Sequence, residues 1–230
     1  MRFFGLAAVA VLMAMPAAAQ NEGAPDTAGE QQATGPSTGS PEAILLFEKG
    51  REAMVAERYD EAAQSYISAC DMGHALACGG AGAVYIGGAG VETNAPKGIE
   101  YMRKACDLND AASCTMAGSL YIVGEVYAEA APLVKKGCDL GDGDGCVELG
   151  RLYYSGDGIE QNVDFAGAKF AKGCSLDNAD GCYTFAAFLI NRDGERAVAM
   201  ANIYLKKALR LDPGHEEATA LMETIKPYLR

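Results

Sequence analysis

The sequence predicts an all-α solenoid in which pairs of helices stack on one another. The main observation is a Cys-x7-Cys unit that occurs four times and contains all eight cysteines: Cys70 and Cys78, Cys106 and Cys114, Cys138 and Cys146, Cys174 and Cys182. The first cysteines of successive units lie 36, 32 and 36 residues apart, a period typical of helix-pair repeats. Apolar residues also recur at helical spacing from residue 42 onward.

Each cysteine unit must contain a chain reversal. On one continuous helix, cysteines with this spacing would lie about 12 Å apart along the axis, whereas a disulfide needs Cα atoms roughly 4.4–6.8 Å apart. The middle of each unit holds a residue type that tolerates the left-handed conformation: Gly73, Asn109, Gly141 and Asp177. The residue that follows is a good helix N-cap in three units, Asp110, Asp142 and Asn178, and a weaker one, His74, in the first. Each unit is therefore predicted to form a helix, a tight turn and a second helix.

The repeat and the turn favour a disulfide inside each unit, between residues i and i+8. Pairing across a repeat, for example Cys78 with Cys106, is the first alternative, and reduced buried thiols are another. A zinc site fits less well, because an isolated x7 spacing matches no common zinc finger or ribbon.

The N-terminus predicts export. Arg2 precedes an apolar run over residues 3–15, and small residues lead to a cleavage site after Ala19, so residues 1–19 are predicted to be a signal peptide. The run is too short to span a bilayer comfortably, and no lipid-attachment cysteine follows it. We therefore expect a periplasmic or secreted protein with no transmembrane segment in the mature chain, where disulfides persist. Residues 20–41 are rich in small and polar types and are predicted to be a disordered linker.

Residues 42–230 are predicted to form the solenoid. The first helix pair, 43–57 and 60–70, has small and apolar residues at tetratricopeptide-like positions. Further helices are expected at 75–87, 111–123, 143–155 and 179–191, and a hairpin of 197–211 and 215–225 caps the array. Four residues after the second cysteine stands a small residue that allows close helix packing, namely Gly82, Gly118, Gly150 or Ala186. The 32-residue repeat is short because its loop at 123–126 lacks four residues.

Several segments resemble Sel1-like repeats: Gly118-Ser119-Leu120-Tyr121, Lys104-Ala105-Cys106-Asp107-Leu108, Lys136-Gly137-Cys138-Asp139-Leu140 and residues 149–158. The cysteine unit in every turn is similar to that of the cysteine-rich, secreted Sel1-like repeat proteins of Helicobacter. This resemblance implies a right-handed superhelix of antiparallel, tetratricopeptide-like helix pairs with one disulfide per inter-repeat turn. It also implies, as an alternative function, the β-lactamase or penicillin-binding activity associated with that group.

No catalytic or metal site is predicted. The two histidines, His74 and His215, lie in turns with no serine or thiol arrangement that suggests a nucleophile and its base. The S-x-x-K and K-T-G motifs typical of β-lactamases do not occur, and the acidic loop 139–145 does not have EF-hand spacing. We therefore expect a non-enzymatic protein without a cofactor, with hydrolase activity as the alternative.

The charge of the chain restricts its partners. Without residues 1–19 the sequence has 18 basic and 31 acidic residues, a net charge of −13. Such acidity argues against binding to nucleic acid or to an anionic membrane surface. It favours protein or peptide partners that are basic or neutral, and we expect the chain to be a monomer.

The predicted binding residues lie on the first helix of each pair, which lines the concave side of tetratricopeptide-like superhelices. Positions not needed for packing include Met116, Ser119, Glu148, Arg151 and Tyr154. Because Tyr and Arg are frequent anchors of interfaces, the third cysteine-linked repeat is the expected hot spot. The alternative is that Glu148 and Arg151 form a solvated surface with no partner.

Overall fold

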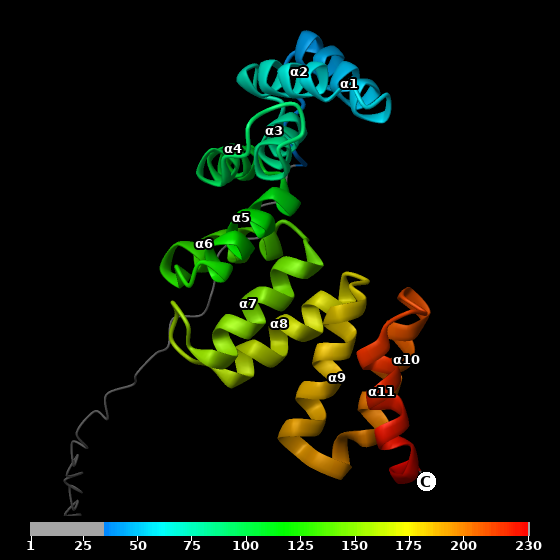
Figure 1. Ribbon diagram of the computed structural model, residues 1–230. Helices are drawn as coiled ribbons and strands as arrows, with labels where there is room; N and C mark the ends of the chain where they lie inside the picture. Colours follow the sequence, from blue (N-terminus) through cyan, green and yellow to red (C-terminus); the bar gives the residue numbers. More distant parts are fainter. Residues whose placement is uncertain (1–34, 230) are drawn as a thin grey trace, which may run out of the picture. The chain divides into compact units, whose positions relative to one another are not determined.

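The computed structural model describes residues 35–229, and this part of the chain is helical (Figure 1). It contains eleven α-helices and two short 3-10 helices, with no strand among the described residues. The predicted signal peptide at 1–19 lies outside these residues, as does most of the predicted linker. No helix of residues 35–229 has the length and hydropathy needed to cross a membrane.

The first ten α-helices form consecutive antiparallel pairs, and one further helix follows them. Their bounds are α1 Pro41–Val55, α2 Tyr59–Asp71, α3 Ala75–Gly87, α4 Ala95–Asp107, α5 Ala111–Val123, α6 Tyr127–Asp139, α7 Gly143–Ser155, α8 Val163–Ser175, α9 Ala179–Asp193, α10 Val198–Leu211 and α11 Glu216–Ile225. The 3-10 helices are Gly194–Ala197 and Lys226–Tyr228. Each helix packs on the next one along the chain, and the first helices α5, α7 and α9 also contact one another. This is the all-α repeat arrangement that the sequence predicts.

The four cysteine units form the turns between helix pairs, and each contains the predicted i to i+8 disulfide. The bonds join Cys70 to Cys78, Cys106 to Cys114, Cys138 to Cys146, and Cys174 to Cys182. The paired Cα atoms lie 4.2–4.5 Å apart, and all eight cysteines are buried. One disulfide per inter-repeat turn is therefore confirmed. Among the described residues neither the alternative pairing across a repeat nor a free thiol is found.

The second cysteine of each unit lies in the first turn of the following helix. Cys114 is in α5 and Cys146 is in α7, and both are fully buried. The predicted left-handed residues between the cysteines have φ values of 85°, 66°, 97° and 58° at Gly73, Asn109, Gly141 and Asp177. The chain reversal that the spacing requires is thus produced at the expected residue of every unit.

The residue after each left-handed position is the N-cap of the next helix. Its side chain does not make the capping hydrogen bond in every unit. Asp142 and Asn178 accept hydrogen bonds from backbone amides three residues on, at 3.1 and 2.6 Å. His74 does the same through Nδ1, with 3.3 Å to the Ala77 nitrogen. Asp110 occupies the predicted N-cap position of α5, but its carboxylate accepts from the Ser113 hydroxyl and makes no capping bond to a backbone amide. The side-chain hydroxyl of a residue three positions later can therefore replace the backbone amide as the donor to the N-cap carboxylate.

Small residues let neighbouring helices approach, as expected. A Cβ atom at Gly82 would lie 2.9 Å from the Gly98 carbonyl oxygen of α4, and one at Gly118 would lie 2.5 Å from a Val134 methyl group of α6. Met102 and Val134, which fill the gaps between layers, are fully buried. Packing rather than ligand contact explains these residues.

The connections inside the helix pairs alternate between short and long. The α1–α2 and α5–α6 connections have only three residues, whereas residues 88–94 and 156–162 form long loops between α3 and α4 and between α7 and α8. Each long loop contains a glycine with a left-handed backbone conformation, Gly90 or Gly158. This glycine packs against the preceding helix pair, at the first residue of its second helix. A Cβ atom at Gly90 would lie 2.1 Å from the Tyr59 carbonyl oxygen, and one at Gly158 would lie 2.5 Å from that of Tyr127. A long loop therefore closes over the short connection before it.

The two ends of the described chain are both attached to the repeats. Residues 35–40 belong to the predicted linker, yet the Ser37 amide donates to the Leu108 carbonyl at 3.0 Å and its own carbonyl accepts from the Ala75 amide at 2.8 Å. Ser40 caps α1, which begins at Pro41. At the other end, α9 continues to Asp193, two residues beyond the predicted end.

The C-terminal hairpin covers the last cysteine-linked repeat. Its core includes Leu205 and Ile225, which pack in one cluster with the Cys174–Cys182 pair. Lys207 reaches back from α10, donates to the Cys174 carbonyl at 2.7 Å and lies 2.8 Å from the Asp177 carboxylate. The hairpin of α10 and α11 is thus joined to the preceding turn by apolar and polar contacts.

Candidate functional site

Two of the predicted binding residues, Arg151 and Tyr154, line a groove between α7 and α9. The groove has a volume of about 630 Å³, which is within the range of ligand sites in proteins. Its other lining residues come from α7, the following loop, α8 and α9: Ser155, Asp157, Phe170, Thr184, Ala187, Phe188 and Asn191. Thr184 stands two residues after its second cysteine, as Met116 and Glu148 do.

The floor of the groove is aromatic. Phe170 and Phe188 are buried and pack edge to face with 5.8 Å between ring centroids, and the Tyr154 ring stands 6.4 Å from that of Phe188. The glycines behind these rings make room for them, because a Cβ at Gly150 would lie 2.5 Å from Phe170 and one at Gly167 2.5 Å from Phe188. Close helix packing thus places two phenylalanine rings beneath a surface groove.

Tyr154 is held in position although its side chain is 42% exposed. The Asn191 amide of α9 donates to its hydroxyl at 3.0 Å, and Gln161 Nε2 donates to its carbonyl oxygen at 2.8 Å. A second hollow of about 310 Å³ shares Tyr154, Phe188 and Asn191 with the groove and is also lined by Arg192. Tyr154 therefore belongs to two adjoining hollows and forms a ridge at their shared border.

The charges around the groove are mostly compensated. Arg151 lies 2.6 Å from the Glu148 carboxylate, and Arg192 lies 3.1 Å from that of Asp193 and over the Phe188 ring. Asp157 lines the groove, and its carboxylate has no ion-pair partner within residues 35–229. The uncompensated charge at the rim is therefore negative.

The other predicted binding residues lie outside the groove. Met116 is 47% exposed and Ser119 partly exposed on α5, which packs against α7. Glu148 contributes only through its ion pair with Arg151. Whether any of the predicted residues bind a partner stays a prediction.

The predicted disulfide residues are structural and do not contribute to the groove. Cys114 and Cys146 begin the two helices that carry Met116, Ser119, Glu148, Arg151 and Tyr154, but no cysteine is among the lining residues. Because each is bonded to the cysteine eight residues before it, neither offers a thiol for catalysis or metal binding. Their effect on the groove is indirect, since they fix where these helices begin.

The residues that sequence reasoning missed are mainly Phe188, Asn191 and Asp157. One signal could have identified Phe188, because the residue six positions after the second cysteine is aliphatic in the other units: Val84, Leu120 and Leu152. An aromatic residue at that position indicates a different surface in the last cysteine-linked repeat.

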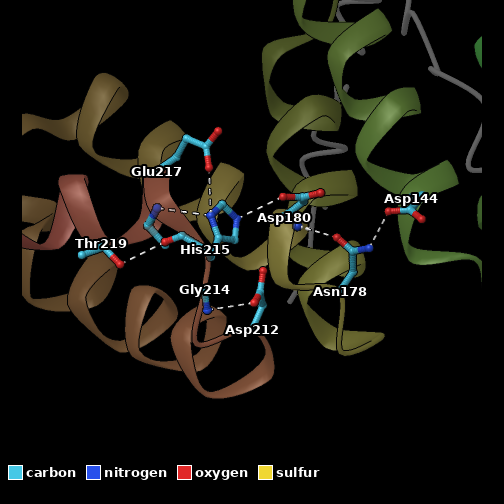
Figure 2. A network of polar contacts seen from close by, with 10 residues as sticks. Asp144, Asn178, Asp180, Asp212, Gly214, His215, Glu217 and Thr219 are labelled. Carbon is cyan, nitrogen blue, oxygen red and sulfur yellow. Dashed lines mark hydrogen bonds and ion pairs between the residues drawn. The ribbon is translucent and has the colours of Figure 1, made fainter.

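His215 lies in a network of polar contacts at the turns (Figure 2). Its Nδ1 accepts from the Ala218 amide at 3.3 Å and so caps α11. Its Nε2 lies 3.0 Å from the Asp180 carboxylate, although the contact does not have the geometry of a well-aligned hydrogen bond. The neighbouring turn has a related contact, in which Asn178 donates to Asp144 at 2.6 Å. These contacts join successive repeats, and we assign His215 a structural role.

The histidines do not form a catalytic group with the cysteines. His74 stacks on Phe47 with 4.3 Å between ring centroids, and its Nδ1 caps α3. Within residues 35–229 no cluster of three or more His, Cys, Asp or Glu side chains could hold a metal ion.

Comparison with known proteins gives the fold. No protein-family model and no curated protein matches the sequence. A protective antigen of uropathogenic Escherichia coli with a Sel1-like repeat fold is similar over 82% of this chain, with 18% identity and a TM-score of 0.74. This chain spans only 42% of the length of that antigen.

Two further solved structures are similar. A Sel1 repeat protein from Oxalobacter formigenes matches over 80% of this chain and 87% of its own, with 20% identity and a TM-score of 0.66. Cysteine-rich protein B of Helicobacter pylori matches over 64% of this chain and 98% of its own, with 28% identity and a TM-score of 0.42. The described chain has the fold of Sel1-like and tetratricopeptide repeat proteins, with a disulfide in each of four turns.

Proposed function

We propose that this protein is an exported, non-enzymatic repeat scaffold that binds a protein or peptide partner on the concave face formed by its first helices. The observation that carries the proposal is the groove between α7 and α9, with its floor of Phe170 and Phe188 and the ridge of Tyr154. Repeat proteins use extended surfaces of this kind to bind partners.

The groove has the features of a binding hot spot. Binding energy at interfaces is concentrated in a few aromatic and arginine residues that lie in well-packed pockets. Burial of one large apolar side chain of a partner in such a groove contributes about 1.5–3 kcal/mol. The Tyr154 side chain is already held by the hydrogen bond from Asn191 to its hydroxyl, so less side-chain entropy is lost on binding.

Export is supported by the cysteine chemistry. Disulfides persist in oxidising compartments and are rare where thiols are kept reduced, and each inter-repeat turn here contains one. N-terminal sequencing of the protein from the cell envelope tests the export step. The expected first residue is Gln20, and an intact Met1 with reduced cysteines would contradict export.

The binding proposal is tested with peptides selected from a random library on the purified protein. Ala187→Arg fills the groove, and Gln64→Arg adds the same charge on the exposed side of α2 as a matched control. Selected peptides should lose at least about tenfold in affinity for Ala187→Arg and for the double variant Arg151→Ala/Tyr154→Ala. Gln64→Arg should bind like the wild type, and all variants should keep helical thermal melts close to the wild type.

Two results would contradict the proposal. Equal binding of the selected peptides to Ala187→Arg and to the wild type would show that the partner surface lies elsewhere. Hydrolysis of a chromogenic β-lactam by purified, metal-free protein would support the enzymatic alternative instead.

A further inference from the structure

We infer that the groove between α7 and α9 takes a peptide in which a bulky apolar side chain is followed or preceded closely by a lysine or arginine. The apolar side chain lies against Tyr154 and Phe188, and the cation lies beside Asp157. This inference rests on the proposed function and gives the chemistry of the partner.

The apolar part follows from the groove lining. Phe170 and Phe188 form the floor, and the small side chain of Ala187 leaves space above it. A polar ligand group placed over the two rings would lose its water without gaining a partner there. A large apolar group is therefore the favoured occupant of the floor.

The basic part follows from the rim. Both arginines beside the groove, Arg151 and Arg192, have carboxylate partners, whereas Asp157 has none among the described residues. Residues 139–193, which contain α7, α8 and α9, include ten acidic and four basic side chains. A cationic group is therefore attracted to the rim, and an anionic group is repelled.

Other occupants fit less well. A second copy of this chain carries the same net negative charge and would bring like charges together at the rim. The chain's own residues 20–34 contain Glu22, Asp26 and Glu30 with no basic or aromatic residue, so their composition offers neither the apolar anchor nor the cation. A separate basic and apolar peptide is the occupant that the groove favours.

The expected contribution of the charge is small and measurable. An exposed ion pair changes affinity by about two- to fivefold, and added salt reduces this effect. The apolar anchor should supply most of the affinity, so the two parts of the inference can be measured separately.

The experiment uses short synthetic peptides with one tryptophan as the apolar anchor. The chain has no Trp, so the fluorescence of the peptide reports binding without a tryptophan background from the protein. Capped glycine peptides carry the tryptophan and a lysine separated by zero, one or two glycines. Matched peptides have glutamate in place of lysine, or alanine in place of tryptophan. Each is titrated with the wild type, Asp157→Asn, Ala187→Arg and the control Glu160→Gln, which removes an exposed acid of the same loop outside the groove.

At least one tryptophan–lysine peptide should bind the wild type about two- to fivefold more tightly than its glutamate partner. Asp157→Asn and added salt should remove this preference, Glu160→Gln should retain it, and Ala187→Arg should weaken both peptides. Equal binding of lysine and glutamate peptides, with both weakened by Ala187→Arg, would overturn the inference and leave the proposed groove in place. Absence of binding up to millimolar peptide, or binding that Ala187→Arg does not change, would overturn both.

Discussion

Both histidines of the chain act as helix N-caps, a role that the residue type alone does not favour. In both His74 and His215, Nδ1 accepts a hydrogen bond from a backbone amide. This nitrogen can accept only when it carries no proton. Their surroundings differ, because His74 stacks on Phe47 whereas His215 faces Asp180 and Glu217. Burial is the main cause that lowers the pKa of His74.

The lowered pKa of His74 predicts a loss of stability in mild acid. The unfolded chain takes up a proton near its ordinary pKa of 6.5, before the folded chain does. The free energy of unfolding should therefore fall as the pH decreases from about 6.5 until the folded pKa is passed. His74→Asn keeps a capping side chain that does not titrate and should reduce this fall. Urea unfolding of both proteins at a series of pH values measures it. An identical pH dependence in the two proteins would contradict the prediction.

The capping residues also show how far single residues can be predicted. The left-handed positions Gly73, Asn109, Gly141 and Asp177 are set by local backbone sterics, and all four are found as expected. The cap at Asp110 depends on competition with the Ser113 side chain, which local statistics do not resolve. Local conformation is therefore more predictable than the choice between two nearby hydrogen-bond partners.

At the scale of the elements, each disulfide closes a short turn between two helices. A loop of this size should stabilise the fold by roughly 2–3 kcal/mol through the entropy of the unfolded chain. Replacement of both Cys106 and Cys114 by alanine should lose about that amount in urea unfolding, and so should replacement of Cys138 and Cys146. Non-reducing digestion and mass spectrometry should first recover the four i to i+8 pairs from the wild type, and free thiols in the folded protein would contradict the pairing.

The helices and two residues of the groove, Arg151 and Tyr154, were predictable, and the rest of the groove was not. Cysteine spacing, turn residues and small packing residues repeat along the chain, so they determine which helices form and how neighbours pack. The groove instead depends on residues that depart from the repeat, such as Phe188 at a position that is otherwise aliphatic and Asp157 in a variable loop. Repetition reveals a common scaffold, whereas the lining of this groove depends on residues that depart from the repeat.

At the scale of the whole molecule, the attachment of the two ends predicts different effects of truncation. Removal of residues 20–34 should leave the melting temperature nearly unchanged. Removal of residues 20–40 should lower the melting temperature slightly, because the Ser37 hydrogen bonds and the Ser40 cap of α1 are lost. The free energy of unfolding should fall by about 1–2 kcal/mol.

Removal of residues 198–230 should have the largest effect, because it exposes the apolar cluster around the Cys174–Cys182 pair. Thermal melts of the three truncated proteins, compared with the mature chain, test this order. A large loss from the removal of residues 20–34 would mean that this segment also stabilises the repeats, and no loss from the C-terminal removal would contradict its role as a cap.

The alternation of short and long connections has a consequence for how such a chain can be lengthened or shortened by evolution. Loss of one helix pair would leave a long loop without the short connection that it closes over, or a short connection without its long loop. Loss or duplication of two adjacent pairs would preserve the fit of Gly90 on Tyr59 and of Gly158 on Tyr127. The cysteines agree, since Cys70 to Cys138 and Cys106 to Cys174 are both 68 residues apart although single repeats differ in length. The structural period of these cysteine-linked turns is therefore a double repeat of 68 residues.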